Sequence, residues 1–155
     1  MATPTPAPAS VRSPATGVHV RVRVAGEQYA LPVEHVQEVV DLDELTPVPG
    51  AAESLLGLLN LGGEIVPAFD LAKILGIEPG GHRAEIGRRR LLVAECGGQR
   101  AAFAVDDVLD VGPLASAMQE SDARYLLAST VLDGELVGML AVESLFDSIV
   151  PEEQR

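Results

Sequence analysis

Residues 18–31 read VHVRVRVAGEQYAL, and this stretch decides the fold class of the chain. Its valines occupy every second position from Val18 to Val24 and alternate with one histidine and two arginines. That period is typical of a β-strand with a buried apolar face and an outward polar face. The Ala25-Gly26-Glu27 turn and the apolar return after it predict an antiparallel hairpin.

Two more hairpins are predicted further along, because paired glycines or Asp-Gly separate apolar runs. Residues 90–95 pair with 101–105, and residues 130–132 pair with 136–142. Residues 64–71 read as another strand, which Pro67 places at a sheet edge or at a bulge. Many short strands and little helix predict an all-β fold, and the pattern leaves small barrels and a sandwich equally open.

Short helical segments are expected between these strands. Pro32 suits the first turn of a short helix, followed by a strand at about residues 38–42. Helical turns are expected at residues 53–59, which are rich in leucine, and at 71–77. Residues 78–87 read as a loop, 115–127 as irregular or partly helical, and 143–149 as an amphipathic closing helix stopped by Pro151.

The composition indicates one soluble domain. The chain has 155 residues, of which 47% are hydrophobic but only 3% aromatic, so we expect a core of Val, Leu, Ile and Ala. Residues 1–16 are rich in Ala and Pro and read as a disordered tail, residues 17–150 as the domain, and residues 151–155 as a second tail. No signal peptide or membrane-spanning run is visible, and a lone cysteine suits a reducing cytosol.

The net charge of -12 is unevenly distributed. Residues 27–70 hold nine carboxylates and no Lys or Arg, and residues 101–155 are also strongly acidic. Such blocks repel phosphate backbones, and few aromatics are present to stack on bases, so we expect no direct nucleic-acid binding. Solubility and steering toward a basic partner explain the charge equally well.

No catalytic or metal-binding constellation stands out. His19, His35 and His82 lack partners at ligand spacing, and Cys96 has no neighbouring base in any motif. The Asp106, Asp107 and Asp110 carboxylates read as the solvent side of an edge strand. Arg88-Arg89-Arg90 reads as the solvated start of a strand in preference to a binding patch. We therefore expect no enzyme activity, no metal and no cofactor.

Four landmarks, in order along the chain, resemble CheW-type domains. They are QYALPV with VQEVV at 28–40, TPVP at 46–49, LGLLNL with IVPAFDL at 56–71, and AVDDVLDV at 104–111. The third resembles the family's NLRG run and its following strand, and the last resembles its VVD-x-V-x-x-V pattern. The similarity runs from about Val18 to Ile149.

The resemblance implies an all-β CheW-like fold of two SH3-like five-stranded barrels with short helices and a C-terminal helix. The barrels would take roughly residues 17–64 and 65–142, closed by helix 143–149. It also implies a non-enzymatic adaptor that binds the cytoplasmic signalling tip of a methyl-accepting chemoreceptor in the groove between the barrels. Such a protein is expected in cytoplasmic receptor clusters, without membrane contact, and near the nucleoid only through a DNA-binding receptor.

Two departures from the family pattern predict a divergent member. Gly62 stands where the NLRG run usually has arginine, and glycine supplies neither its charge nor its donors. The segment 114–125 is shorter than usual. The chain therefore resembles the accessory adaptor of Frz-type systems in gliding bacteria, with weak or absent coupling to the histidine kinase. The alternative is a conventional CheW that bridges receptor and kinase.

The resemblance carries contacts over by position. Receptor contacts are implied at Val33, Val36, Glu38, Asn60 and Gly62. Val33 and Val36 fit an ordinary core equally well, and the Asn60 side chain also fits a cap of the turn at residues 61–62.

Contacts with the kinase regulatory domain or with other CheW-like proteins are implied at Gly57, Leu58, Arg88 and Asp106. Acidic side chains that would meet basic receptor side chains, in a salt-sensitive contact, are Glu38, Asp41, Asp43 and Glu44.

Other classes remain open at this point. A detached kinase regulatory domain or a small-molecule sensor would need a ligand pocket. An enzyme on a small barrel lacks catalytic groups, and an SH3-like nucleic-acid binder is opposed by the charge.

Overall fold

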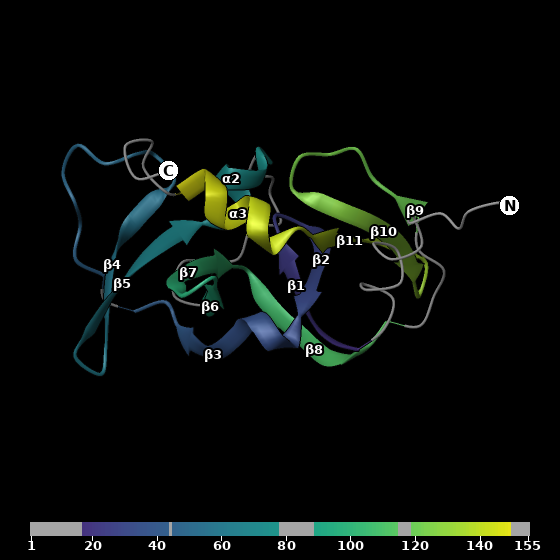
Figure 1. Ribbon diagram of the computed structural model, residues 1–155, viewed down its shortest axis with the longest axis horizontal. Helices are drawn as coiled ribbons and strands as arrows, with labels where there is room; N and C mark the ends of the chain where they lie inside the picture. The colour runs from purple at the N-terminus through teal and green to yellow at the C-terminus, as the bar shows by residue number, and fades with distance from the viewer. Residues whose placement is uncertain (1–16, 44, 78–88, 115–118, 150–155) are drawn as a thin grey trace, which may run out of the picture.

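The computed structural model describes residues 17–43, 45–77, 89–114 and 119–149 (Figure 1). The expected tails, the loop at 78–87 and Arg88 lie outside these residues. The elements in chain order are β1 Val18–Val24, β2 Glu27–Pro32, the 3-10 helix η1 Val33–His35, β3 Val36–Asp41, β4 Leu55–Leu61, β5 Glu64–Asp70, α2 Leu71–Leu75, β6 Arg90–Cys96, β7 Gln99–Val105, β8 Asp107–Pro113, β9 Gln119–Glu120, β10 Leu126–Leu132, β11 Glu135–Leu140 and α3 Val142–Ile149.

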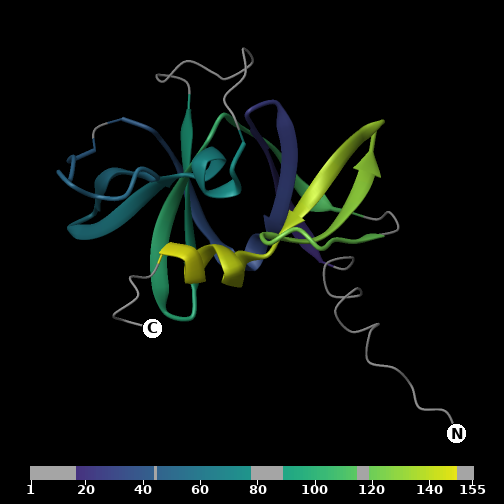
Figure 2. The ribbon, with the colours of Figure 1, turned by 90° about the horizontal axis from the view of Figure 1, so that it is seen from above.

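The strands form two sheets, which confirms the predicted all-β class. One sheet has six strands in the order β8-β1-β2-β11-β10-β9, and the other has five in the order β3-β6-β7-β5-β4. The two sheets lie side by side in Figure 2, and α3 runs from β11 of the first sheet beneath the second. The strands are not divided between the sheets at residues 64 and 65 as expected, because the five-stranded sheet takes the middle of the chain and the six-stranded sheet takes both ends.

The opening hairpin forms as its period predicts. β1 and β2 pair antiparallel, and the valines at 20, 22 and 24 are buried while Arg21 and Arg23 lie on the other face. His19 shares the face of the arginines, yet its side chain is buried. The hairpins β6–β7 and β10–β11 also form where the glycine turns predict them. At the second turn Asp133 has a φ of 52°, a left-handed conformation that aspartate tolerates.

The helical turn expected at residues 53–59 is wrong, because the leucines belong to strand β4. Gly62 and Gly63 turn the chain so that β4 pairs antiparallel with β5, and the backbone pairing outweighs the apolar spacing. Gly57 lies at a break in the register, so Leu55 packs into one apolar cluster and Leu56 into another.

Two other expectations need correction. β5 is not an edge strand, since β4 and β7 flank it. Its pairing with β7 begins only at Ala68, so Pro67 has a partner on one side alone and no ladder donor is lost on the other. The irregular segment expected at 115–127 contains the short strand β9, which pairs with Ala128 and Ser129 of β10.

Three apolar clusters hold the sheets. Small clusters fill each sheet separately, with Val137 and Met139 in the six-stranded sheet and Leu91 and Val93 in the five-stranded one. The largest cluster joins both sheets to α2 and α3. At its centre the three phenylalanines of the chain meet, with ring centroids 6.2 Å apart for Phe69 and Phe103 and 5.7 Å for Phe103 and Phe146. Aromatic packing therefore matters more than the composition suggests.

A buried ionic cluster also connects the sheets. The Arg89 guanidinium lies 3.2 Å from the Asp70 carboxylate and 3.8 Å from that of Asp106, and all three side chains are almost fully buried. Asp106 accepts a hydrogen bond from the amide of Ala25 at 2.8 Å, and its own amide donates to the Arg23 carbonyl. The solvated roles expected for Arg89 and Asp106 are therefore wrong. Asp107 and Asp110 are exposed on the edge strand β8, as predicted.

Candidate functional site

The topology brings two distant segments together at one corner of the six-stranded sheet. β2 and β11 pair in parallel, with Gln28 opposite Val137 and Ala30 opposite Met139. Because paired parallel strands end at the same side of a sheet, η1 after β2 and α3 after β11 begin next to each other. The start of β10 completes the corner, since Leu126 pairs with Leu140.

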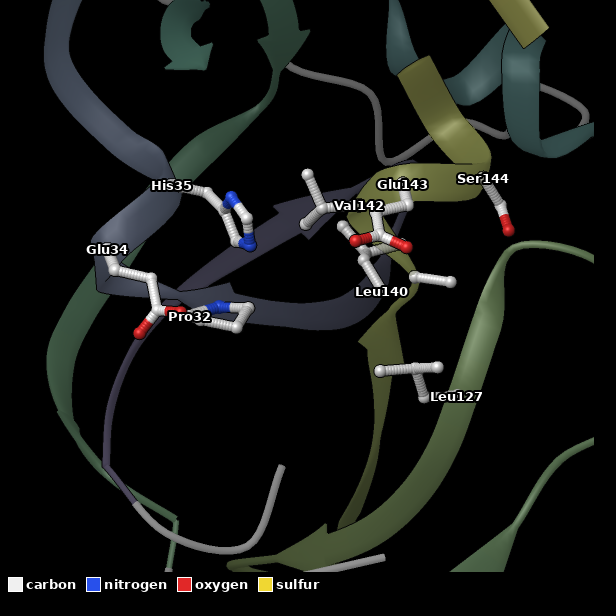
Figure 3. A pocket seen from close by; sticks show the side chains of 9 residues that line it. Pro32, Glu34, His35, Leu127, Leu140, Val142, Glu143 and Ser144 are labelled. Atoms are coloured by element: carbon white, nitrogen blue, oxygen red, sulfur yellow. The ribbon is translucent and has the colours of Figure 1, made fainter. Parts of the chain in front are cut away.

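A pocket of about 310 Å³ lies at this corner (Figure 3). Its walls are Pro32, Leu127, Leu140, Ala141 and Val142, and its polar rim consists of Glu34, His35, Glu143 and Ser144. In Figure 3, His35 projects from the η1 side toward Val142 and Glu143 of α3, and Leu127 lies on β10 below them. We call this site the corner pocket.

The first turn of α3 is fixed from below. The amide of Ala141 donates to the Tyr125 carbonyl at 2.8 Å, and Leu145 and Phe146 are buried in the main core. Those anchors leave Glu143 on the exposed side. The nearby thiol of Cys96 is half-buried, and burial raises its pKa, with the carboxylates of Glu143 and Asp147 adding to the rise. The thiol is thus protonated at neutral pH, which disfavours a nucleophilic role.

The polar rim of the corner pocket presents acceptors. Glu34 and Glu143 make no hydrogen bond or salt bridge with any described residue. The Nδ1 atom of His35 lies 3.1 Å from the Glu95 carbonyl, which can only accept, so Nδ1 carries the proton. In the neutral ring the other nitrogen is then an acceptor. The rim combines a ring nitrogen with two carboxylates that no described side chain pairs with.

Three of the implied receptor contacts lie on η1 and β3, and none of them lines the corner pocket. Val33 belongs to η1 and is 39% exposed, so its side chain is available to a partner. Val36 is half-buried and packs against the main core, which favours the core interpretation for that residue. Glu38 is exposed on β3, the edge strand that follows η1.

The other implied contacts lie on the β4–β5 hairpin, at the opposite edge of the five-stranded sheet from β3. Asn60 caps its turn as predicted, because its Oδ1 accepts from the Gly63 amide at 2.9 Å. Gly62 is exposed with a φ of 62°. Gly57 is buried, and a Cβ there would lie 2.8 Å from the Thr46 carbonyl oxygen, which confirms the predicted close approach. Leu58 is half-buried opposite Pro67.

The remaining contact candidates are Arg88, which lies outside the described residues, and Asp106, whose carboxylate is engaged inside the molecule. A second pocket, of about 260 Å³, is lined by Leu42, Leu45, Leu56, Asp43 and Arg89. Within the described ranges, no group of three His, Cys, Asp or Glu side chains is arranged to hold a metal ion. Neither α2 nor α3 has the length and apolar character needed to cross a membrane.

Sequence reasoning missed the corner pocket. Pro32, Glu34, His35, Leu127 and Glu143 come from three separate segments, and only the parallel pairing of β2 with β11 unites them. The Val-Glu-His run directly after Pro32 was interpreted as a short helix, which forms as η1, and not as part of a pocket. Nothing in the sequence indicated that the run lies beside α3.

Comparison with known proteins gives a consistent result. A protein-family model described as CheW-like domain matches residues 19–150. The chain is 27% identical over 130 residues to a chemotaxis protein CheW of Thermotoga maritima, covering 80% of this chain and 83% of that protein. It is 34% identical over 136 residues to Protein FrzA of Myxococcus xanthus, covering 81% and 82%. A crystal structure of the scaffolding protein TtCheW from Thermoanaerobacter tengcongensis aligns with a TM-score of 0.73 at 27% identity, covering 81% and 84%.

Proposed function

The chain belongs to the CheW-like domain family, and from that premise we propose that it is a non-enzymatic adaptor of a chemosensory array that binds the cytoplasmic tip of a chemoreceptor. The observation that carries this proposal is the corner pocket, a concave site with apolar walls and a polar rim. Leu127 lines it and is 46% exposed, and Val33, between the lining residues Pro32 and Glu34 in the sequence, is 39% exposed. Both offer apolar surface that the fold itself does not use.

The chemistry of the site favours binding over catalysis. Among the described residues, no group of His, Cys, Asp or Glu side chains is arranged to bind a metal ion, and the Cys96 thiol near the pocket has a raised pKa. Ligand sites typically have volumes of roughly 300–1,000 Å³, and the corner pocket, at about 310 Å³, lies at the lower end of that range. Its size therefore suits one protruding side chain of a protein partner. An adaptor of this kind would act at the cytoplasmic face of receptor clusters.

The finer proposal is an accessory adaptor that couples weakly to the histidine kinase, in a Frz-type system. The 34% identity to Protein FrzA supports a relation to such systems. Gly62 supports weak coupling, because the turn offers a partner no charged side chain at that position. A bridging CheW that binds receptor and kinase together is the second candidate, and the relatives named chemotaxis protein CheW favour it.

A pull-down with the cognate receptor tip, with and without the kinase regulatory domain, tests both proposals. We expect this chain to retain the tip and to bind the regulatory domain weakly. No retention of the tip would refute the adaptor role. Tight binding of the regulatory domain would refute the accessory role and favour the bridging one.

The variant Gly62→Arg sharpens the second part of this test. A Cβ at Gly62 would meet no atom within 4 Å, so the turn has room for the larger side chain. The left-handed backbone adds strain of about 1 kcal/mol. We expect the variant to stay folded and to bind the regulatory domain more tightly than the wild type. Gly63→Arg, at the neighbouring turn position with a φ of 96°, is the matched control.

A further inference from the structure

We infer that the corner pocket takes the basic side chain of its partner, an arginine or a lysine, with the alkyl stem against the apolar walls and the cationic head at the rim. This inference rests on the proposed function, because it specifies the side chain that an adaptor partner inserts. It follows from the chemistry of the polar groups around the pocket, which are mainly hydrogen-bond acceptors and carry negative charge.

The rim attracts donors and repels acceptors. Glu34 and Glu143 are exposed carboxylates on opposite sides of the pocket, and neither is neutralised by a described side chain. In the neutral ring of His35, the second nitrogen adds a third acceptor, because Nδ1 donates to the Glu95 carbonyl. A partner carboxylate would face two like charges, whereas an ammonium or guanidinium group meets acceptors only.

The walls suit the rest of such a side chain. Pro32, Leu127, Leu140 and Val142 supply apolar surface between the two carboxylates (Figure 3). Arginine and lysine bury their methylene stems along apolar surface while the charged head reaches a polar rim. A purely apolar side chain would fill the walls but leave the two carboxylates beside a desolvated interface, which costs free energy.

The wider charge supports the same occupant. Asp147 on α3 is a further acidic group on this side, since its carboxylate and that of Glu143 both raise the pKa of the nearby Cys96 thiol. Across the described rim the only other ionisable side chain is His35, since Ser144 is neutral. An approaching basic side chain is therefore steered to the pocket from several directions.

The test uses the full chain, labelled with ¹⁵N, and two small probes at millimolar concentration. N-acetyl-arginine amide is expected to shift the amide signals of Leu127 and of residues 141–144 in a saturable way. N-acetyl-leucine amide is expected to shift them far less. Comparable or larger shifts with the leucine probe, or none with the arginine probe, would overturn the inference.

Paired variants connect the shifts to the rim. The double variant Glu34→Gln/Glu143→Gln keeps the shape of both side chains and removes both charges, so binding of the arginine probe should weaken about tenfold or more. Glu53→Gln/Glu120→Gln removes two exposed carboxylates that do not line the pocket and should leave binding unchanged. Equal weakening in both double variants would show general charge attraction and contradict a defined site.

The same preparations separate this inference from the adaptor proposal. A chain that retains the receptor tip but ignores the arginine probe contradicts the basic-side-chain inference and leaves the adaptor role standing. A chain that binds the arginine probe in the pocket but does not retain the tip supports the inference and contradicts the adaptor role.

Discussion

Arg21 and Asp110 form a two-point ion pair between β1 and the edge strand β8. Nε of Arg21 lies 3.0 Å from Oδ1 of Asp110, and Nη2 lies 2.6 Å from Oδ2. The remaining Nη1 donates to Oε1 of Gln28 at 2.7 Å, and Gln28 donates in turn to Glu135. One series of polar contacts therefore crosses β8, β1, β2 and β11, of which β2 and β11 lead to the corner pocket.

Within this series of polar contacts, Asp110 and Arg21 should differ in how much they contribute to the free energy of unfolding. Asp110 is 55% exposed, so Asp110→Asn should lower the free energy of unfolding by at most about 1 kcal/mol. Arg21→Ala also removes the donor to Oε1 of buried Gln28 and should cost about 1–3 kcal/mol more. Urea unfolding measures both. Asp41→Asn, in a more exposed pair with Arg90, is the control and should change little. Equal losses for Arg21→Ala and Asp41→Asn would contradict the account.

The free energy of unfolding should fall as the pH drops below 6.5, the ordinary pKa of histidine, because of His19. Burial lowers the pKa of His19 from its usual 6.5, and this effect outweighs the opposing effects of the Gly17 backbone and the Glu34 carboxylate. Between the folded and unfolded pKa values the unfolded chain binds more protons, so the free energy of unfolding rises with pH there. The full contribution is present above pH 6.5 and is lost below it.

The variant His19→Gln removes the titrating group and should flatten this part of the stability profile. His35→Gln keeps the buried histidine and serves as the control, which should retain the slope. Asp110 gives a separate, more acidic effect, because the hydrogen bond from Arg21 lowers its pKa below 3.8 and its contribution is lost as the pH falls through that lowered pKa. If the free energy of unfolding of His19→Gln keeps the wild-type slope between pH 6.5 and the acidic range where Asp110 titrates, a neutral buried ring at position 19 is contradicted.

Arg89→Leu should destabilise the protein strongly. The guanidinium is 5% exposed and is the cation placed between the buried carboxylates of Asp70 and Asp106. Removing one partner from a buried ion pair costs about 3–5 kcal/mol, because the carboxylates lose this cation while they stay buried. Arg90→Leu, at the exposed neighbouring residue, should cost no more than about 0.5 kcal/mol in the same urea titration. Similar midpoints for the two variants would refute the structural role of the cluster.

Leu127→Asp should weaken receptor binding without unfolding the chain. Leu127 is 46% exposed at the corner pocket, so an aspartate there is solvated in the free protein, but in the complex it removes apolar wall surface and buries a charge in its place. Val131→Asp is the matched control, since Val131 is 57% exposed further along the same strand. We expect tip retention at least about tenfold lower for Leu127→Asp only. Equal retention by both variants would place the docking surface elsewhere.

Much of the fold could be predicted from the sequence, because local chemistry determines hairpins. The turns at Gly97-Gly98 and Asp133-Gly134 fix which strands pair, and the alternation of β1 fixes which face is buried. The leucine run at 55–61 could not be assigned in the same way, because a short apolar run fits a helix or a strand and its partner strand decides.

The site was less predictable than the fold, because it depends on contacts between distant segments. The capping role of Asn60 is local and was predicted. The parallel pairing of β2 with β11 joins residues more than a hundred positions apart, and no pattern near Glu34 indicates that Glu143 lies across a pocket. The same limit explains Arg89 and Asp106, which look solvated in a charged sequence and meet only when the two sheets pack.

Backbone hydrogen exchange of the chain, alone and with the receptor tip, would locate the partner directly. The account predicts slower exchange on binding at residues 33–35, at Leu127 and at residues 142–144, while the distal hairpin turn at 133–134 stays unchanged. Protection confined to that turn or to the β4–β5 hairpin, with no change around η1 and the start of α3, would contradict docking at the corner pocket.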